Sequence, residues 1–392
     1  MKKALVIHGD IYGFGGAENH AIKIIKILEE LDFDVTVLHA GGALDAPRIH
    51  KQVGISLDPV RVRFQQAQVF VRHPTWFENS LLMRYAFVLR EARGLAESAD
   101  LVVGTYGETP LEARVLVQSM HIPLFFFDRE SLGYLGVQNP KRLMLAIRKA
   151  YVLAARLIGG WSRQAVERGV MLTNSKWTGA QFRRHYPAGR VETIYHGAHT
   201  RIDSTSPQYL PFEERANTVV LVGRVVPFKR VHLAIEIVDG LRARGHAVEL
   251  LIIGGGGGAY ADSIAEMLAA RPHAQWRRDL PRDDMEQLIA RQRWGLHCAE
   301  FEHYGLAPLE LQRLGCVTFV HDSGGQAEAV SDDTLKYRDV DDAIRNIDQV
   351  MTDKDLAFRL FAALPKTVAA HEPETHREAF VERLRQLGVH GA

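Results

Sequence analysis

The stretch that decides the fold spans residues 297–330 and reads HCAEFEHYGLAPLELQRLGCVTFVHDSGGQAEAV. Pro308 suits the first turn of a helix and the residues after it have helical character, so a helix is predicted to begin near Gly305. Gly315 ends that helix, and residues 317–320 are typical of a short buried strand. A helix N-terminus that follows a glycine presents free backbone N–H groups and the positive end of the helix dipole. This arrangement suits a phosphate.

Two carboxylates flank this predicted helix N-terminus. Glu302 lies in the loop before it, and Glu310 lies about one turn inside, with seven residues between them. One carboxylate could face a substrate beyond the phosphate, and the other a ribose hydroxyl beside it. The pair alone fits equally well with two unrelated glutamates, one exposed in a loop and one on a helix. The choice between this interpretation and a binding site depends on the rest of the chain.

Length and composition bound the class of protein. At 392 residues the chain is longer than one hydrophobic core normally spans, so two domains are expected. A formal net charge of +1 gives no strong field for nucleic acid, so no nucleic-acid partner is predicted. Two cysteines, Cys298 and Cys316, fit a reducing cytosol better than a disulfide scaffold. Without a membrane-length apolar run or a signal-peptide pattern, the predicted location is cytoplasmic.

The N-terminus has the pattern of a strand, a glycine-containing loop, a helix and a second strand. Residues 4–8 and 35–38 are the apolar runs, and the helix between them carries apolar residues from 21 to 28. This order is typical of a parallel doubly wound sheet. Gly15 and Gly16 lie where the first strand meets its helix, so their backbone could approach an anionic ligand, although a plain flexible turn fits as well. The motif is not GxGxxG, which disfavours a dinucleotide.

Two further buried strands are predicted, at residues 100–104 and 122–127. The second ends in Asp128, Arg129 and Glu130. Ligands of open parallel sheets bind beyond the carboxyl ends of the strands, which makes these residues site candidates.

Residues 141–168 read as a helix with basic residues at intervals of seven, interrupted by glycines at 159 and 160. Arg142, Lys149, Arg156 and Arg163 form this stripe. Such a stripe fits a helix that lies on an anionic membrane surface, at the inner face in a cytoplasmic protein. A solvated basic face on a domain helix is the more ordinary interpretation.

A second α/β pattern begins after a polar stretch. The strand at 219–222 leads to Arg224 and Lys229, a helix follows, and the next strand ends in five glycines, 254–258. Those glycines indicate either close backbone approach to a flat ligand or a loose loop. The predicted domain limits are an N-terminal domain at 1–200, a linker at 201–217, a C-terminal domain at 218–370, and a C-terminal helix at 371–392 that could pack back on the N-terminal domain.

Three motifs in this order resemble one enzyme family. They are Gly15-Gly16-Ala17-Glu18, then Arg224 with Lys229, then Glu302 and Glu310. Together they resemble the retaining nucleotide-sugar glycosyltransferases of family GT4, across both halves of the chain. The resemblance implies the GT-B fold, an α/β architecture in which two Rossmann-like domains face each other across a cleft. Residues 302–306, with Asp322-Ser323-Gly324-Gly325, look most like mannosyltransferases of lipid-linked oligosaccharide and bacterial polysaccharide assembly.

The resemblance implies a role for each motif residue. Arg224 and Lys229 would neutralise the pyrophosphate of the donor, and fixed cations with helix N–H groups stabilise a leaving diphosphate without a metal. Glu302 would hold sugar hydroxyls, and Glu310 would accept hydrogen bonds from the ribose. The remaining residues of the predicted binding site are Gly15, Gly16, Glu18, His303, Tyr304, Gly305 and Leu306.

One departure from the family pattern concerns the N-terminal domain. Many relatives carry a histidine where this chain has Asp128, so Asp128 is the predicted substitute. No cofactor is expected beyond the nucleotide sugar. The two Asp-x-Asp patterns, at 32–34 and 339–341, read as turn and capping residues and not as a metal site.

The resemblance favours transfer of mannose from GDP-mannose to a glycan or lipid-linked saccharide. A UDP-sugar donor, and a non-catalytic subunit that binds sugar nucleotides, stay open as alternatives. A phosphorylase or hydrolase on the same fold is disfavoured, because no lysine is evidently placed for pyridoxal phosphate and the chain is short for that class.

Overall fold

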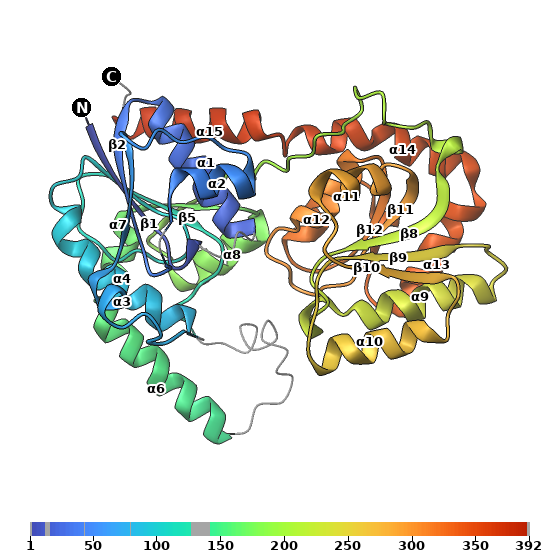
Figure 1. Cartoon of the computed structure of the whole chain (residues 1–392), viewed down its shortest axis with the longest axis horizontal. Coiled ribbons are helices and arrows are strands. Elements are labelled where there is room, and N and C mark those ends of the chain that lie inside the picture. The colour runs from blue at the N-terminus through green and yellow to red at the C-terminus, as the bar shows by residue number, and fades with distance from the viewer. Residues whose placement is uncertain (1, 12–15, 43, 79, 127–141, 390–392) are drawn as a thin grey trace. The chain divides into compact units, whose positions relative to one another are not determined.

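The computed structural model describes residues 2–11, 16–42, 44–78, 80–126 and 142–389. The chain divides into two compact units, each built around its own parallel sheet (Figure 1). Of the described residues, those up to 196 and those from 376 onward form the first unit, and residues 197–375 form the second.

The first unit alternates strands and helices. Its elements are β1 Lys2–Ile7, α1 Gly16–Glu30, β2 Phe33–His39, α2 Ala46–Val53, β3 Val62–Gln66, α3 Gln68–Arg72, α4 Leu81–Ala96, β4 Leu101–Gly104, β5 Leu116–Met120, α6 Arg142–Gly159, α7 Arg163–Arg168, β6 Val170–Thr173, α8 Lys176–His185, β7 Arg190–Thr193 and most of α15 Pro373–Gln386. Among the described residues the sheet has the parallel order β3-β2-β1-β4-β5-β6-β7.

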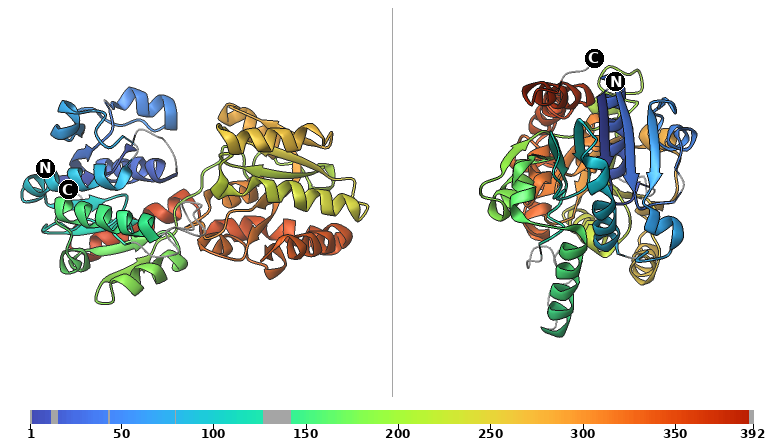
Figure 2. Two further views of the ribbon diagram at one scale, coloured as in Figure 1. Left: turned by 90° about the horizontal axis from the view of Figure 1, so that it is seen from below. Right: turned by 90° about the vertical axis from the view of Figure 1, so that its left-hand side faces the viewer.

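Both faces of this sheet are buried, which explains the continuous apolar run of β1. Ala4 and Val6 pack in a cluster with α1 and the later turns of α15. Leu5 and Ile7 point to the opposite face, where α4 and α6 cover them. Figure 2 shows the helices on the two faces of the sheet.

The second unit repeats the pattern. Its elements are η2 Phe212–Glu214, β8 Ala216–Val222, η3 Pro227–Lys229, α9 Val231–Ala243, β9 Glu249–Ile253, α10 Ala259–Ala269, β10 Ala274–Arg277, α11 Arg282–Ile289, β11 Gln292–His297, α12 Leu306–Arg313, β12 Val317–His321, η4 Gly325–Ala329, η5 Asp333–Leu335, β13 Lys336–Tyr337, α13 Val340–Thr352 and α14 Lys354–Ala369. The described strands have the parallel order β10-β9-β8-β11-β12-β13.

Successive side chains of β8 point to opposite faces of the sheet and therefore pack into two separate hydrophobic clusters. Val219 and Leu221 pack under α9, α10 and α13, whereas Val220 packs on the other face with residues of α11 and α12.

The segment before β8, residues 201–215, packs on the second unit through Arg215, whose exposed fraction is 2%. The Arg215 guanidinium donates to the carbonyls of Leu210 and Leu314, both at 2.9 Å.

One of the predicted strands, at residues 122–127, is wrong. No strand forms at residues 122–126. The carboxylate of Glu108 instead accepts the Leu124 N–H at 2.8 Å and the Phe125 N–H at 3.3 Å, and Pro123 has no N–H to offer a ladder.

The predicted capping role of Asp339 is confirmed, and neither cysteine forms a disulfide. Cys298 and Cys316 are buried free thiols, and burial raises the pKa of each to about 12. Asp339 caps α13, with its side chain accepting the Asp342 N–H at 2.8 Å. Within the described part of the chain, no helix is long and apolar enough to cross a membrane.

Candidate functional site

The predicted helix after the Glu302 loop is confirmed as α12, which begins directly after Gly305. Gly305 has φ +90, in the left-handed region that favours glycine, and it turns the chain from the loop into the helix. The first N–H groups of a helix have no partner inside it, and here they include those of Leu306 and Ala307. They lie at the carboxyl end of β11, the edge of a parallel sheet where ligands bind.

Lys229 and Glu302 form an ion pair at this edge. The Lys229 ammonium donates to Glu302 Oε2, and the two side chains are about equally exposed, at 20% and 21%. Lys229 ends the short helix η3 after β8, and Glu302 lies in the loop between β11 and α12. The adjacent strands β8 and β11 therefore bring together two residues that are 73 positions apart.

The pair fixes the charge of Glu302. Burial alone would raise the pKa of the Glu302 carboxyl, but the Lys229 ammonium outweighs burial and holds that pKa well below its usual value. Burial, with the charge of Lys229, lowers the pKa of His297, whose Nε2 lies 3.5 Å from Glu302 Oε2. Because the folded-state pKa of Glu302 is the lower one, its stabilising charge is present above about pH 4 and is lost only in stronger acid.

The backbone of Glu302 is held by a glycine-rich turn. Gly325 N–H donates to the Glu302 carbonyl at 2.7 Å. A Cβ on Gly324 would lie 2.4 Å from that carbonyl oxygen and 2.8 Å from the Glu302 nitrogen, and Gly324 has φ +72. Next to it, Ser323 Oγ accepts the Phe301 N–H at 2.9 Å. The Ser323-Gly324-Gly325 sequence thus sets the position of the Glu302 loop.

Glu310 has a partner that the sequence did not reveal. Arg282, at the start of α11, donates to Glu310 Oε1 at 2.9 Å and to the His199 carbonyl at 2.8 Å. The same guanidinium pairs with the buried Glu286. Arg282, itself held by Glu286, therefore fixes the Glu310 carboxylate, whose side chain is 22% exposed.

Arg224 is exposed at the end of β8, five residues before Lys229. The glycine run after β9 packs against this turn, because a Cβ on Gly254 would lie 2.2 Å from the Gly223 carbonyl and one on Gly256 would lie 2.7 Å from Val225 Cβ. Close approach to neighbouring chain therefore accounts for two of the five glycines.

His303 and Tyr304 lie beneath the loop. Both are buried, and the Tyr304 hydroxyl lies 2.8 Å from His371 Nδ1. The Tyr304 side chain therefore ties the loop to His371, which follows α14.

The predicted residues of the first unit are placed only in part. Gly16 opens α1 and is exposed, and Glu18 lies half-buried in the first turn of that helix. Gly15 and Asp128 lie outside the described residues.

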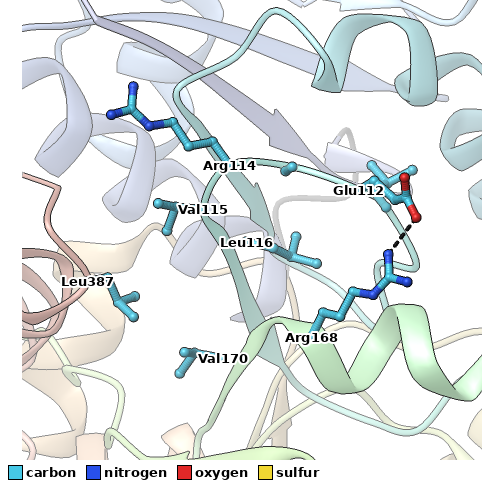
Figure 3. Close-up of a pocket in the computed structure, with 9 residues that line it drawn as sticks. Glu112, Arg114, Val115, Leu116, Arg168, Val170 and Leu387 are labelled. Carbon is cyan, nitrogen blue, oxygen red and sulfur yellow. Dashed lines mark hydrogen bonds and ion pairs between the residues drawn. The ribbon is translucent and has the colours of Figure 1, made fainter.

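Two hollows in the surface lie away from these residues. One, in the first unit, is lined by Leu116 and Val170 at the amino ends of β5 and β6, and by the Glu112–Arg168 ion pair (Figure 3). This is the opposite edge of the sheet from the one where ligands bind. The other is lined by Asp203, Arg313 and Glu372 of the second unit.

Comparison with known proteins gives a match to a family model, a match to a curated relative and matches to solved structures. The family model described as "Glycosyl transferases group 1" matches residues 203–363, within the second unit. A curated relative, the GDP-Man:Man(3)GlcNAc(2)-PP-Dol alpha-1,2-mannosyltransferase of Candida glabrata, is 25% identical over 170 residues. That match covers 40% of this chain and 33% of the relative, so the chain spans about a third of the relative's length.

Solved structures match over nearly the whole chain. HepE from Anabaena, in complex with UDP and glucose, has a TM-score of 0.65 at 16% identity, covering 98% of this chain and 100% of that one. Sucrose-phosphate synthase from Thermosynechococcus elongatus has a TM-score of 0.70 at 15% identity, covering 99% of each chain. WaaG, a glycosyltransferase of lipopolysaccharide biosynthesis, has a TM-score of 0.68 at 17% identity, covering 96% and 98%. These likenesses confirm the predicted GT-B fold.

Proposed function

We propose that this chain is a retaining hexosyltransferase of the group 1 glycosyltransferases, family GT4, and that it uses a nucleotide-sugar donor. The Lys229–Glu302 pair beside the α12 N-terminus is the observation that carries the proposal. It sets a fixed cation and free N–H groups where a diphosphate leaves, and a fixed carboxylate where sugar hydroxyls bind.

Each remaining residue has a place in this reaction. Arg224 and Lys229 neutralise the diphosphate as the glycosidic bond breaks, and Leu306 offers it an amide. Glu302 accepts hydrogen bonds from the sugar, and Glu310, positioned by Arg282, accepts them from the ribose. The acceptor attacks the same face that the diphosphate leaves, and a phosphate oxygen takes its proton. Gly16 and Asp128 are the proposed contributions of the first unit.

For the donor, we propose GDP-mannose, and for the acceptor a glycan or lipid-linked saccharide. The mannosyltransferase name of the C. glabrata relative supports this choice. A UDP-sugar is the second candidate, because UDP accompanies HepE in its crystals. A melting-temperature panel of GDP, UDP, ADP and their sugar conjugates tests both.

The panel has a distinct result for each candidate. A ligand at a hundred times its dissociation constant stabilises the fold by about 2.7 kcal/mol, which for units of this size raises the melting temperature by several degrees. We expect such a shift with GDP and GDP-mannose and with no other ligand. A shift with UDP species alone would identify a UDP-sugar as the donor in place of GDP-mannose. The absence of a shift with any nucleotide would favour a non-catalytic subunit.

The predicted basic stripe forms only in part, with Arg142, Lys149 and Arg156 at intervals of seven along α6. The Arg156 guanidinium donates to the Phe125 carbonyl at 2.9 and 2.6 Å and stacks on Trp161, and Arg163 belongs to the separate helix α7. Besides Lys149, α6 exposes large apolar side chains, among them Ile147 at 62%, Leu153 at 57% and Leu157 at 74%. Figures 1 and 2 show α6 reaching beyond the other elements of the first unit.

We therefore propose that α6 touches an anionic membrane surface through these apolar side chains, beside Lys149. Replacing Leu153 and Leu157 with serine is expected to weaken sedimentation with anionic vesicles at least about tenfold, because each buried leucine contributes roughly 1.5–3 kcal/mol. Phe358→Ser, at an exposed site of the second unit, is the control. If the wild-type protein does not bind such vesicles at low salt, the proposed membrane contact is wrong.

A further inference from the structure

Three histidines from distant parts of the chain meet inside the first unit. His20 lies in α1, His121 directly follows β5, and His196 follows β7. One ring nitrogen of each lies within 4.8 Å of one from each of the others. The His20 and His196 rings stack with centroids 3.5 Å apart and an interplanar angle of 12°. One of these two rings must therefore turn before all three nitrogens can reach one ion at the metal–imidazole bond length of about 2.0–2.1 Å.

The three imidazoles are in the protonation state that binds metals. His20 and His196 are buried, with exposed fractions of 4% and 5%. Burial lowers the pKa of His121 to about 4 and lowers those of His20 and His196 well below the ordinary value. The rings are therefore neutral at pH 7, and a metal ion displaces no proton from them.

His121 is also oriented as a ligand. One ring nitrogen of His121 forms a hydrogen bond with the backbone of Thr105. This bond raises the pKa of His121 and so partly opposes burial, which lowers it. Its Nε2 is buried and has no hydrogen-bond partner within the part of the chain that the structure describes. A histidine whose second nitrogen donates to a carbonyl is the usual arrangement of a metal-bound imidazole, and an unpaired buried nitrogen requires an explanation.

The ligand atoms and the neighbouring side chains indicate which metal ions fit the cluster. Three imidazole nitrogens suit zinc, cobalt, nickel or copper and do not suit magnesium or calcium, which prefer oxygen. His376 packs edge-on against His20 with ring centroids 5.0 Å apart, and the positive charge of Lys23 acts on His20, His196 and His376. That charge opposes a bound cation, so the site requires an anion such as hydroxide in the fourth coordination position to offset it.

We propose that His20, His121 and His196 bind one divalent transition-metal ion of the zinc class. The ion ties helix α1 to the carboxyl ends of β5 and β7 from within the first unit. All three ligands belong to the first unit, and the proposal does not depend on the donor or on transfer itself. Because 100 or 74 residues separate the successive ligands, the sequence shows no ligand spacing of the short zinc motifs.

The test is Co²⁺ binding to the full-length, untagged protein after treatment with a chelator. We expect one equivalent to bind with visible d–d absorption, and Zn²⁺ to displace it. His121→Gln should weaken binding by about a hundredfold or more, because loss of a ligand costs at least as much as loss of a second-shell group. His39→Gln is the matched control, since His39 is buried in the same unit but lies outside the cluster.

X-ray absorption of the wild-type Co²⁺ or Zn²⁺ complex covers the case in which His121→Gln fails to fold. Three imidazole ligands on the ion support the proposal. Less than about a tenth of an equivalent bound, fewer than three imidazoles on the ion, or equal affinity in wild type and a folded His121→Gln variant would overturn it, leaving four packed neutral histidines.

Discussion

Replacing Lys229 with alanine is expected to lower sugar transfer at least about a hundredfold while the protein stays folded. The change removes the cation proposed for the leaving diphosphate and leaves the Glu302 carboxylate without its strongest partner. Loss of one preorganised electrostatic group typically costs 10²–10³ in kcat. The readout is release of nucleoside diphosphate from the donor that the melting panel identifies, with saccharide acceptors present.

Glu302→Ala should have an effect of similar size, since it removes the other member of the pair. Arg244→Ala is the matched control, because Arg244 pairs with Asp348 on the surface of the same unit at 2.8 Å. Exposed ion pairs contribute about 0–1 kcal/mol, so this variant should transfer sugar at the wild-type rate. Wild-type rates in Lys229→Ala or Glu302→Ala would contradict the proposed site.

Gly324→Ala is expected to damage both activity and stability. A Cβ at this position would meet the Glu302 carbonyl oxygen at 2.4 Å and the Glu302 nitrogen at 2.8 Å, and these are backbone atoms that no side-chain rotation can move away. The positive φ of Gly324 adds strain. We expect a loss of about 2 kcal/mol, which lowers the melting temperature by roughly 4–8 °C, together with a fall in transfer rate.

Gly257→Ala provides a matched control for this substitution. It lies in the glycine run of the same unit, and a Cβ there would meet nothing within 4 Å. Thermal unfolding and donor turnover should both stay near wild type. If Gly324→Ala behaved like Gly257→Ala, the glycine turn would not be what positions Glu302.

The sequence was most informative where one local pattern carries the structure. The order of Pro308, Gly315 and the apolar residues 317–320 predicted α12 and β12 correctly, because helix and strand signals there involve only near neighbours. The prediction failed at residues 122–127. A short apolar run looks like a strand wherever it occurs, and only the fold brings the Glu108 carboxylate to its backbone.

The partners of the candidate residues could not be predicted in the same way. Glu302 and Glu310 stood out by their spacing, but their partners Lys229 and Arg282 lie 73 and 28 positions away. Such pairs depend on the order of strands in the sheet and not on local spacing. The positive φ of Gly324 and the neutral state of His297 likewise follow from packing that no single segment encodes.

Calorimetric titration of GDP and UDP into the wild-type protein and into Lys229→Ala tests the central claim most directly. The claim is that a nucleoside diphosphate binds beside Lys229 at the N-terminus of α12. We predict that wild type binds one nucleotide per chain and that Lys229→Ala binds it at least about tenfold more weakly, since a hydrogen bond to a charged group contributes about 1.5–3 kcal/mol. Binding of equal strength in both proteins, or binding in neither, would contradict it.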